Sequence, residues 1–172
     1  MERPALAPPV VLAKGQVSAR QFRDAFAQLP AGVSVLTTYA PEGPCGMTAS
    51  AVCSLSQDPP LALAALANDS RTLARIRVHG AFGINVLRAR DTAVADLFAR
   101  PAPDPAHRFD GLPHEPVASV PVLCEALVWL ACEVVGLYPG GDHTILTGLV
   151  RAAGRRPGVP LVWHRRRYTS PA

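Results

Sequence analysis

Residues 46–56 of the chain read GMTASAVCSLS, a run of small side chains in which hydroxyl and apolar residues alternate. Side chains on a strand point to opposite faces in turn, so the hydroxyl side chains would share one face. They are Thr48, Ser50, Ser54 and Ser56. Small side chains also let a flat ligand reach the backbone N–H and C=O groups. The stretch predicts one strand with a hydroxyl-lined binding face. The alternative is an ordinary half-exposed strand of an antiparallel sheet, where such alternation is common.

Further strands are predicted on both sides of this stretch. Residues 33–39 are rich in β-branched side chains and would form a hairpin with the central strand through the turn at 41–44. Residues 61–67 form a continuous apolar run, typical of a strand buried on both faces, although periodicity alone also allows a helical segment. Other strands are expected at 82–87, 127–135 and 144–150, with a tight connection at 138–142 and a further edge strand within 161–168.

Capping patterns predict three short helices. Ser18 and Gln21 form a capping box, and the helix that follows would bury one apolar stripe that includes Phe22, Phe26 and Leu29 before it ends at Pro30. Ser70 would begin a second helix that runs to Val78, with Leu73 and Ile76 facing inward. Asp91 would cap a third helix that ends before Pro101, with Val94, Leu97 and Phe98 on one side.

Residues 101–121 have little periodicity and are rich in Pro, His, Asp and Gly, which predicts a long loop. His107, Arg108 and Phe109 lie in this loop. We expect them to be solvated, and the alternative is that they cover a binding site.

The number and spacing of these elements indicate the fold class. Six or seven strands, short helices and brief connections are typical of a mainly β fold with an antiparallel, closed or nearly closed sheet. A chain of 172 residues fits one domain. We expect a flexible, Pro-rich leader at residues 1–16 and a single domain at 17–172.

Composition excludes several classes of function. The chain is 49% hydrophobic and 17% charged, and its net charge of +4 comes from scattered arginines, so neither disorder nor nucleic-acid binding is expected. The low surface charge predicts a homodimer. The four cysteines form no CxxC pair and no metal-ligand spacing, so no metal site is expected. Reduced cysteines and the lack of a signal peptide or membrane-spanning run predict a cytoplasmic protein.

Five motifs stand around the central stretch in order: LPAGV at 29–33, DPPL at 58–61, NDSRT at 68–72, INVL at 84–87 and GDH at 141–143. In this order and spacing they resemble the short-chain flavin reductases, the flavin-reductase-like family that supplies reduced flavin to two-component monooxygenases. The resemblance covers about residues 22–168. The chain departs from the pattern at Ala51 and Val52, where the family more often has Ser and Phe, so the choice of flavin stays open.

The resemblance implies a dimeric split β-barrel that acts as an NAD(P)H:flavin oxidoreductase. Such an enzyme transfers hydride from NADH or NADPH to FMN or FAD, and the reduced flavin diffuses to a partner monooxygenase. Hydride transfer between stacked rings needs no side-chain nucleophile and no metal, which agrees with the lack of the usual catalytic motifs. The alternative is a non-catalytic flavin-binding split-barrel protein that serves as a sensor or carrier.

The resemblance also assigns site residues. Thr48, Ala49 and Ser50 would meet the flavin ring edge, and Ser54 and Ser56 would lie near the ribityl chain. Asn68, Ser70 and Thr72 would lie on the phosphate side. The expected cofactor-binding set is Met47, Thr48, Ala49, Ser50, Ser54, Ser56, Asn68, Ser70, Arg71 and Thr72.

Physical chemistry supports part of this assignment. Ser70 at a helix N-terminus offers unpaired N–H groups and a favourable dipole to a phosphate, and Arg71 adds charge, although Ser70 would also act as a plain N-cap. His143 is the expected catalytic residue, which would seat the nicotinamide by packing or hydrogen bonding. The alternative is that His143 is an exposed loop residue.

Overall fold

The central stretch forms two strands instead of one. In the computed structural model, which describes residues 17–100 and 106–171, β3 (Gly43–Ala49) ends before Ser50 and β4 (Val52–Gln57) begins after Ala51. The prediction of one continuous strand is wrong, because the chain leaves one sheet edge at Ser50 and joins another. Thr48 therefore shares no strand face with Ser54. The predicted leader at residues 1–16 lies outside the described residues.

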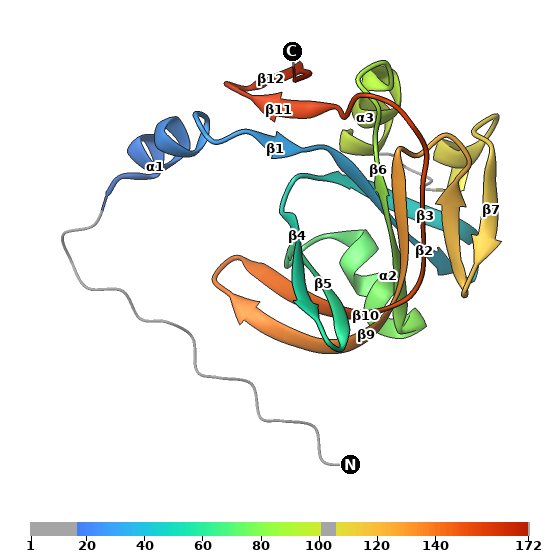
Figure 1. Cartoon of the computed structure of the whole chain (residues 1–172). Coiled ribbons are helices and arrows are strands. Elements are labelled where there is room, and N and C mark those ends of the chain that lie inside the picture. The colour runs from blue at the N-terminus through green and yellow to red at the C-terminus, as the bar shows by residue number, and fades with distance from the viewer. Residues whose placement is uncertain (1–16, 101–105, 172) are drawn as a thin grey trace.

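Seven strands form one antiparallel sheet in the order β3-β2-β6-β9-β10-β5-β4. The strands other than β3 and β4 are β2 (Ser34–Ala40), β5 (Pro60–Ala67), β6 (Ala81–Val86), β9 (Val128–Gly140) and β10 (His143–Arg155). β3 and β4 occupy opposite edges, yet only two residues join them. The sheet must therefore curl until its two edges meet, and in the described part of the chain no ladder closes the seam (Figure 1). This curled, open sheet confirms the predicted mainly β, antiparallel fold class.

The five predicted strands that belong to the main sheet outside the central stretch are all present, with changes at their ends. β9 and β10 extend well beyond the predicted ranges, so Tyr138 and Pro139 lie inside β9 and the connection is the two-residue turn Gly141-Asp142. In β5 one face is buried and the other is half-buried, so the prediction of a strand buried on both faces is wrong. Among the described residues, no element covers that second face completely.

Two predicted helices pack against the sheet. α2 (Arg71–His79) begins at Ser70, whose side chain accepts a hydrogen bond from the Leu73 N–H, and ends at Gly80 in the left-handed conformation, as expected. α3 (Thr92–Ala99) follows Asp91, but the Asp91 carboxylate accepts from the Arg88 N–H and makes no cap hydrogen bond.

Their buried faces follow the prediction only in part. Leu73, Ile76 and Phe98 are buried as predicted, whereas Leu97 is exposed.

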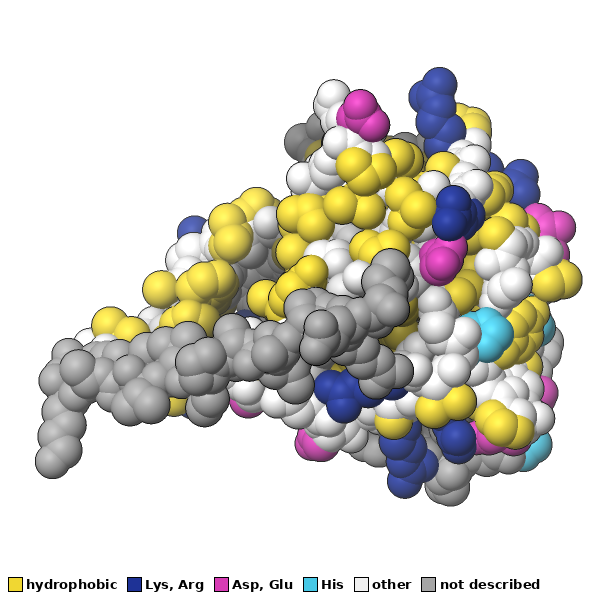
Figure 2. Space-filling view, turned by 90° about the horizontal axis from the view of Figure 1, so that it is seen from below, with side chains coloured by type: hydrophobic (Ala, Val, Ile, Leu, Met, Phe, Trp, Pro, Cys, Tyr) yellow, Lys and Arg dark blue, Asp and Glu magenta, His cyan; other side chains and the backbone are white. Residues whose placement is uncertain are grey.

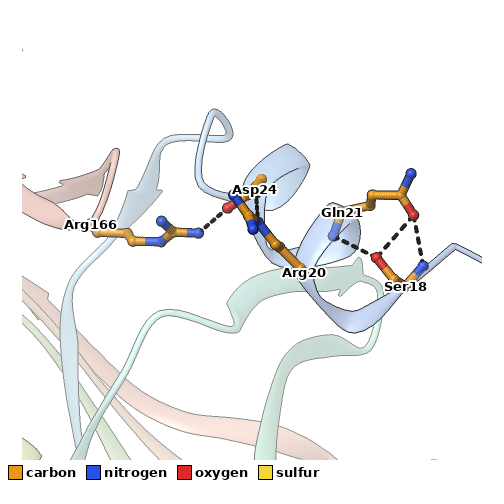
Figure 3. Close-up of polar contacts among 5 residues, drawn as sticks. All are labelled: Ser18, Arg20, Gln21, Asp24 and Arg166. Atoms are coloured by element: carbon orange, nitrogen blue, oxygen red, sulfur yellow. Dashed lines mark hydrogen bonds and ion pairs between the residues drawn. The ribbon is translucent and has the colours of Figure 1, made fainter.

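α1 (Ala19–Phe26) has the predicted capping box but does not bury its apolar stripe. Phe22, Phe26 and Leu29 are each more than half exposed, and no residue of α1 is buried. The helix projects from the body and is held by the tail, where Arg166 pairs with Asp24 (Figures 1 and 3). The prediction of a buried stripe is wrong for the single chain, because no other described element reaches it.

The predicted long loop contains a hairpin. After a 3-10 turn, η1 (Ala106–Phe109), the strands β7 (His114–Val117) and β8 (Val120–Leu123) pair in antiparallel register. Pro116 pairs opposite Pro121, and prolines within strands disguise such a pattern. The turn is made by Ala118 and Ser119, both with positive φ, where glycine or asparagine is the usual signal.

The remaining strands form a second, small sheet. β1 (Ala31–Gly32), β11 (Val162–His164) and β12 (Arg167–Thr169) make up this three-stranded sheet in the tail region, where one edge strand was expected.

The apolar core lies inside the curled sheet. Phe82, Ile84 and Leu146 are at most 1% exposed and pack with α2 through Leu73 and Ile76. A second cluster joins α3 to the far side of β2 and contains Phe98 and Phe109, whose rings meet edge to face at 5.1 Å. Burial of this kind stabilises by about 1.5–3 kcal/mol for each large side chain. The two clusters fix α2 and α3 on either side of β3.

Candidate functional site

A cleft of about 1100 Å³ lies over β3, the edge strand that contains the start of the central stretch. Cys45, Gly46, Met47 and Thr48 of β3 form its floor. α2 forms one wall, and the end of α3 together with Arg108 of η1 forms the other. The cleft is therefore built from three segments, and β3 holds all of them together.

The α2 wall presents the start of a helix to the cleft. The Ser70 hydroxyl accepts from the Leu73 N–H and lies 3.0 Å from the Met47 sulfur, which fixes the first turn of α2 above the floor. Arg71 and Thr72 also line the cleft. The first N–H groups of an α-helix have no partner within the helix, and the helix dipole makes this end attract anions.

The opposite wall is fixed to the floor by polar contacts. The Thr48 hydroxyl donates to the Ala95 carbonyl of α3 at 2.6 Å, and the Arg108 Nη1 donates to the Gly46 carbonyl at 3.0 Å. A Cβ at Gly46 would stand 2.7 Å from the Leu36 carbonyl oxygen and 3.3 Å from the Phe98 ring. Only glycine lets β3 and α3 approach this closely.

Positive charge predominates among the described residues that line the cleft. They include four arginines, Arg71, Arg75, Arg100 and Arg108, against the two acids Glu42 and Asp69. Arg75 pairs with Glu42. Burial, and then the nearby charge of Arg71, lower the pKa of the Arg108 guanidinium. The two guanidinium groups thus repel each other across a space that favours an anion.

Asn68 and the Gly141-Asp142-His143 turn, far apart in sequence, meet at one corner. The Asn68 side-chain amide donates to the Gly141 carbonyl at 3.1 Å, and the Asn68 N–H donates to the Asp142 carbonyl at 3.0 Å. Asn68 Oδ1 accepts from the Thr144 hydroxyl at 2.7 Å. These three hydrogen bonds fix the turn beside the start of α2.

His143 stands at the edge of this corner and does not line the cleft. Its register partner in β5, Ala67, does line it. The His143 Nδ1 lies 2.7 Å from the Asp142 carboxylate, which accepts only, so Nδ1 carries the proton and Nε2 is left for another partner. The hydrogen bond and the charge of His143 lower the pKa of Asp142.

The structure brings together about half of the residues predicted from the sequence. Met47, Thr48, Ser70, Arg71 and Thr72 line the cleft. Ala49 and Ser50 continue from its floor into the seam between β3 and β4.

Other predicted residues lie outside the cleft. Asn68 and His143 form the neighbouring corner. Ser54 and Ser56 lie on β4, the opposite edge of the sheet, because the central stretch is broken at Ser50.

Several residues that line the cleft were missed. Arg75 lies four residues after Arg71, a helical spacing that places both on one face of α2, so this signal was present in the sequence. Arg108 was expected in a solvated loop, but it reaches the floor of the cleft, and Phe109 beside it is 4% exposed. Cys45, Phe98 and Arg100 come into the site only through the packing of β3 against α3.

The donor set fits the phosphate of a flavin nucleotide. A helix N-terminus such as that of α2, hydroxyls such as those of Ser70 and Thr72, and arginine side chains are the groups that phosphates bind in proteins. Among the described residues, no group of three or more His, Cys, Asp or Glu side chains is arranged to hold a metal ion.

Comparisons with known proteins agree with this geometry. The family described as "Flavin reductase like domain" matches residues 26–172. The chain is 42% identical to "Flavin reductase (NADH)" of Kitasatospora aureofaciens, over 93% of this chain and 85% of that protein. It is 36% identical to "4-hydroxyphenylacetate 3-monooxygenase, reductase component" of Thermus thermophilus, over 86% of this chain and 93% of that protein.

Solved structures give the same result. The NADH:FAD oxidoreductase of Streptomyces globisporus superposes with a TM-score of 0.85 at 32% identity, over 96% of this chain and 99% of that one. The styrene monooxygenase flavin reductase of Pseudomonas putida gives a TM-score of 0.80 at 29% identity, over 88% of this chain and 97% of that one.

Proposed function

Because the chain belongs to the flavin-reductase-like family, we infer that it is an NADH-dependent flavin reductase that transfers hydride from NADH to FMN or FAD. The observation that carries this proposal is the cleft over β3, where the start of α2 and the arginines form an anion site next to the small side chains of the central stretch. NADH is the hydride donor named for several relatives.

The residues of the chain bind the flavin and the nicotinamide and orient them toward each other. We place the flavin phosphate at Ser70 and Thr72, with Arg71 beside it, and the flavin ring along Thr48, Ala49 and Ser50 at the seam. When bound, the flavin accepts hydride directly from the nicotinamide, so no side chain has to act as a nucleophile. The corner at Asn68 and His143 would seat the nicotinamide. Ser54 and Ser56, on the other side of the seam, remain candidates for the ribityl chain only if the flavin crosses it.

The reduced flavin would pass to a separate monooxygenase. Relatives along most of the chain are named as reductase components of two-component monooxygenases, among them the reductase subunit HsaB of Mycobacterium tuberculosis, at 31% identity. The open cleft, lined mainly by one sheet edge and two helices, allows the flavin to leave.

The test is steady-state oxidation of NADH by the purified chain, titrated with FMN, FAD and riboflavin, with NADPH as a parallel donor. We expect turnover that depends on free flavin and saturates with FMN or FAD, with riboflavin weaker because it lacks the phosphate. Flavin binding without NADH oxidation would instead establish the sensor or carrier alternative. If the chain neither binds flavin nor oxidises NADH, the proposal is wrong.

We also propose that residues 17–172 form one domain that works as a homodimer in the cytoplasm. Figure 2 shows apolar side chains on the face that it presents. Among the described residues, the exposed large apolar side chains include Phe22 and Phe26 of α1 and Val135 and Tyr138 of β9. A second copy would cover such a surface. The four cysteines are free thiols, which suits a reducing compartment. No helix in the described residues is long and apolar enough to span a membrane.

A further inference from the structure

Arg77 and Thr144 make a contact that lies outside the cleft. Arg77 is in the last turn of α2, and Thr144 follows His143 in β10. The Arg77 Nη2 donates to the Thr144 hydroxyl at 3.0 Å, although 67 positions separate the two residues in the sequence. Thr144 is 5% exposed, whereas Arg77 is exposed, and neither residue lines the cleft. An exposed cation therefore reaches a buried hydroxyl beside the corner that contains His143.

This contact is the first of three side-chain hydrogen bonds that end at the Gly141-Asp142 turn. The Thr144 hydroxyl donates to Asn68 Oδ1 at 2.7 Å, and the Asn68 side-chain amide donates to the Gly141 carbonyl at 3.1 Å. An arginine side chain only donates, and a carbonyl oxygen only accepts. The two ends thus fix the direction of the bonds between them, and the positive charge at the donor end strengthens those bonds.

The three hydrogen bonds bear on His143 because it lies between two residues that they hold. On one side, the Asp142 carbonyl accepts from the Asn68 N–H at 3.0 Å, and on the other side Thr144 binds the Asn68 side chain. Without the bond from Thr144, the Asn68 side chain would be free to turn to water, and the turn would lose its side-chain anchor. The His143 ring, and the Asp142 carboxylate that fixes its tautomer, would then sample more positions.

We propose that Arg77 is a positioning residue for hydride transfer, which acts through Thr144 and Asn68 on the turn before His143. The inference rests on the proposed function, in which His143 seats the nicotinamide. A simpler role for Arg77 would be to stabilise the end of α2, since a positive charge in the last turn interacts favourably with the helix dipole. Thr144 distinguishes the two roles, because it is uncharged and belongs to β10.

The first arm of the experiment is steady-state NADH oxidation by the full-length chain at saturating flavin, with flavin affinity measured alongside. Arg77→Met keeps the apolar stem and removes the donors, and Thr144→Val removes the hydroxyl at nearly constant volume. Each should raise the KM for NADH about fivefold, the effect of one hydrogen bond, and leave flavin affinity unchanged. Thr144→Ser keeps the hydroxyl and should restore the parent KM. The matched control is Arg151→Met, which removes an exposed arginine that pairs with Glu133 on the same sheet.

A double variant shows whether Arg77 acts through His143. In a chain that contains His143→Ala, the further change Arg77→Met should not raise the KM for NADH again, because the residue to be positioned is gone. A full additional increase would overturn the inference, and so would Arg77→Met with the kinetics of the parent chain. An effect of Arg77→Met without an effect of Thr144→Val would leave Arg77 with the helix-end role alone, which also overturns it.

Amide hydrogen exchange provides an arm that does not depend on activity. The Asn68 N–H, which donates to the Asp142 carbonyl, should exchange about fivefold faster in Arg77→Met. The Ala65 N–H, which donates to the Ala51 carbonyl, should exchange at the parent rate. Unchanged exchange at Asn68 would contradict the inference. Failure of the proposed function is recognised separately, because the parent chain itself would then not oxidise NADH, whereas exchange at Asn68 still shows whether Arg77 holds the turn.

Discussion

At the scale of single residues, His143 is positioned by its neighbours more than by its own strand. The Asp142 carboxylate fixes the proton on His143 Nδ1, and Asn68 holds the turn from the other side. This leaves Nε2 available on a residue whose strand partner, Ala67, lines the cleft. A histidine held in one tautomer can donate or accept one well-defined hydrogen bond.

We predict that His143→Ala lowers the efficiency of NADH oxidation and leaves flavin affinity nearly unchanged. Loss of one placed hydrogen bond or packing contact costs about 1–3 kcal/mol, so kcat/KM for NADH should fall roughly tenfold to hundredfold. Steady-state kinetics at saturating flavin, with flavin binding measured by fluorescence quenching, gives both quantities. An equal loss of flavin affinity would place His143 at the flavin, and no change in either would make it an exposed turn residue.

The thiols of two buried cysteines should make the stability of the fold depend on pH. Burial raises the pKa of Cys45 to about 11 and that of Cys132 to about 12, against 9.0 for an exposed thiol. A group with a raised folded-state pKa stabilises the fold fully below its unfolded pKa and loses this contribution as the pH rises. Stability should therefore decline between about pH 9 and 12.

We predict that thiol labelling distinguishes the two buried cysteines from the exposed Cys53. At pH 8 Cys53, which is exposed, should react rapidly with a disulfide reagent, whereas Cys45 and Cys132 should react only after unfolding. Tandem mass spectrometry after timed labelling identifies the sites and separates Cys45 from Cys53 within the tryptic peptide that they share. Cys53→Ser serves as the control that removes the rapid phase. Rapid labelling of Cys132 in the folded chain would show that the core opens locally.

At the scale of elements, α2 combines a structural and a functional role at one end. Ser70 caps the helix and also packs on Met47 of the cleft floor. The cap holds the first turn in place, and this turn is where we propose that the flavin phosphate binds. On the proposed function, the stability of α2 and the binding of flavin are coupled at this residue.

We predict that Ser70→Ala lowers the free energy of unfolding by about 1 kcal/mol, the usual effect of losing an N-cap, and shifts Tm by about 2–4 °C. Ser70→Asp is the matched variant, because it keeps a cap and favours the helix dipole but repels a phosphate. Thermal unfolding and flavin titration should show Ser70→Asp as stable as the parent chain with much weaker flavin binding. Parent-like flavin binding by Ser70→Asp would move the phosphate away from α2.

At the scale of the whole molecule, the single chain leaves apolar surface on α1 uncovered. The rings of Phe22 and Phe26 pack on each other at 4.5 Å, but both remain more than half exposed, and the tail holds the helix away from the sheet through Arg166 and Asp24 (Figure 3). A helix so placed is stable only if something covers its apolar side.

We predict that the chain is a dimer and that Phe22→Glu combined with Phe26→Glu makes it a monomer. The two positions are exposed in the single chain, so the fold should survive, and a charge in a dimer interface opposes association. Sedimentation velocity at micromolar concentration measures the change, and Arg23→Glu on the same helix is the control. A monomeric parent chain, or a double variant that stays dimeric, would rule out this interface.

The sequence by itself determined the elements of this protein and one side of its site. Caps at Ser18 and Ser70 predicted two helices correctly, and apolar runs predicted every strand of the main sheet outside the central stretch, because caps and hydrophobic periodicity are local signals. Met47, Thr48 and Ser70, which the sequence assigned to one site, line the same cleft, and the binding of flavin there stays a prediction. The strands at 114–123 were hidden by prolines and by a turn without glycine.

Tertiary structure alone decided where the sheet is open and what forms the second wall of the cleft. The break at Ser50 places β3 and β4 on opposite edges, which separated Ser54 and Ser56 from Thr48. Arg108 reaches the site because Phe109 beside it is buried against Phe98, a contact between residues from two different segments. Strand pairing and ring packing between distant segments depend on the fold of the whole chain, and no local pattern encodes them.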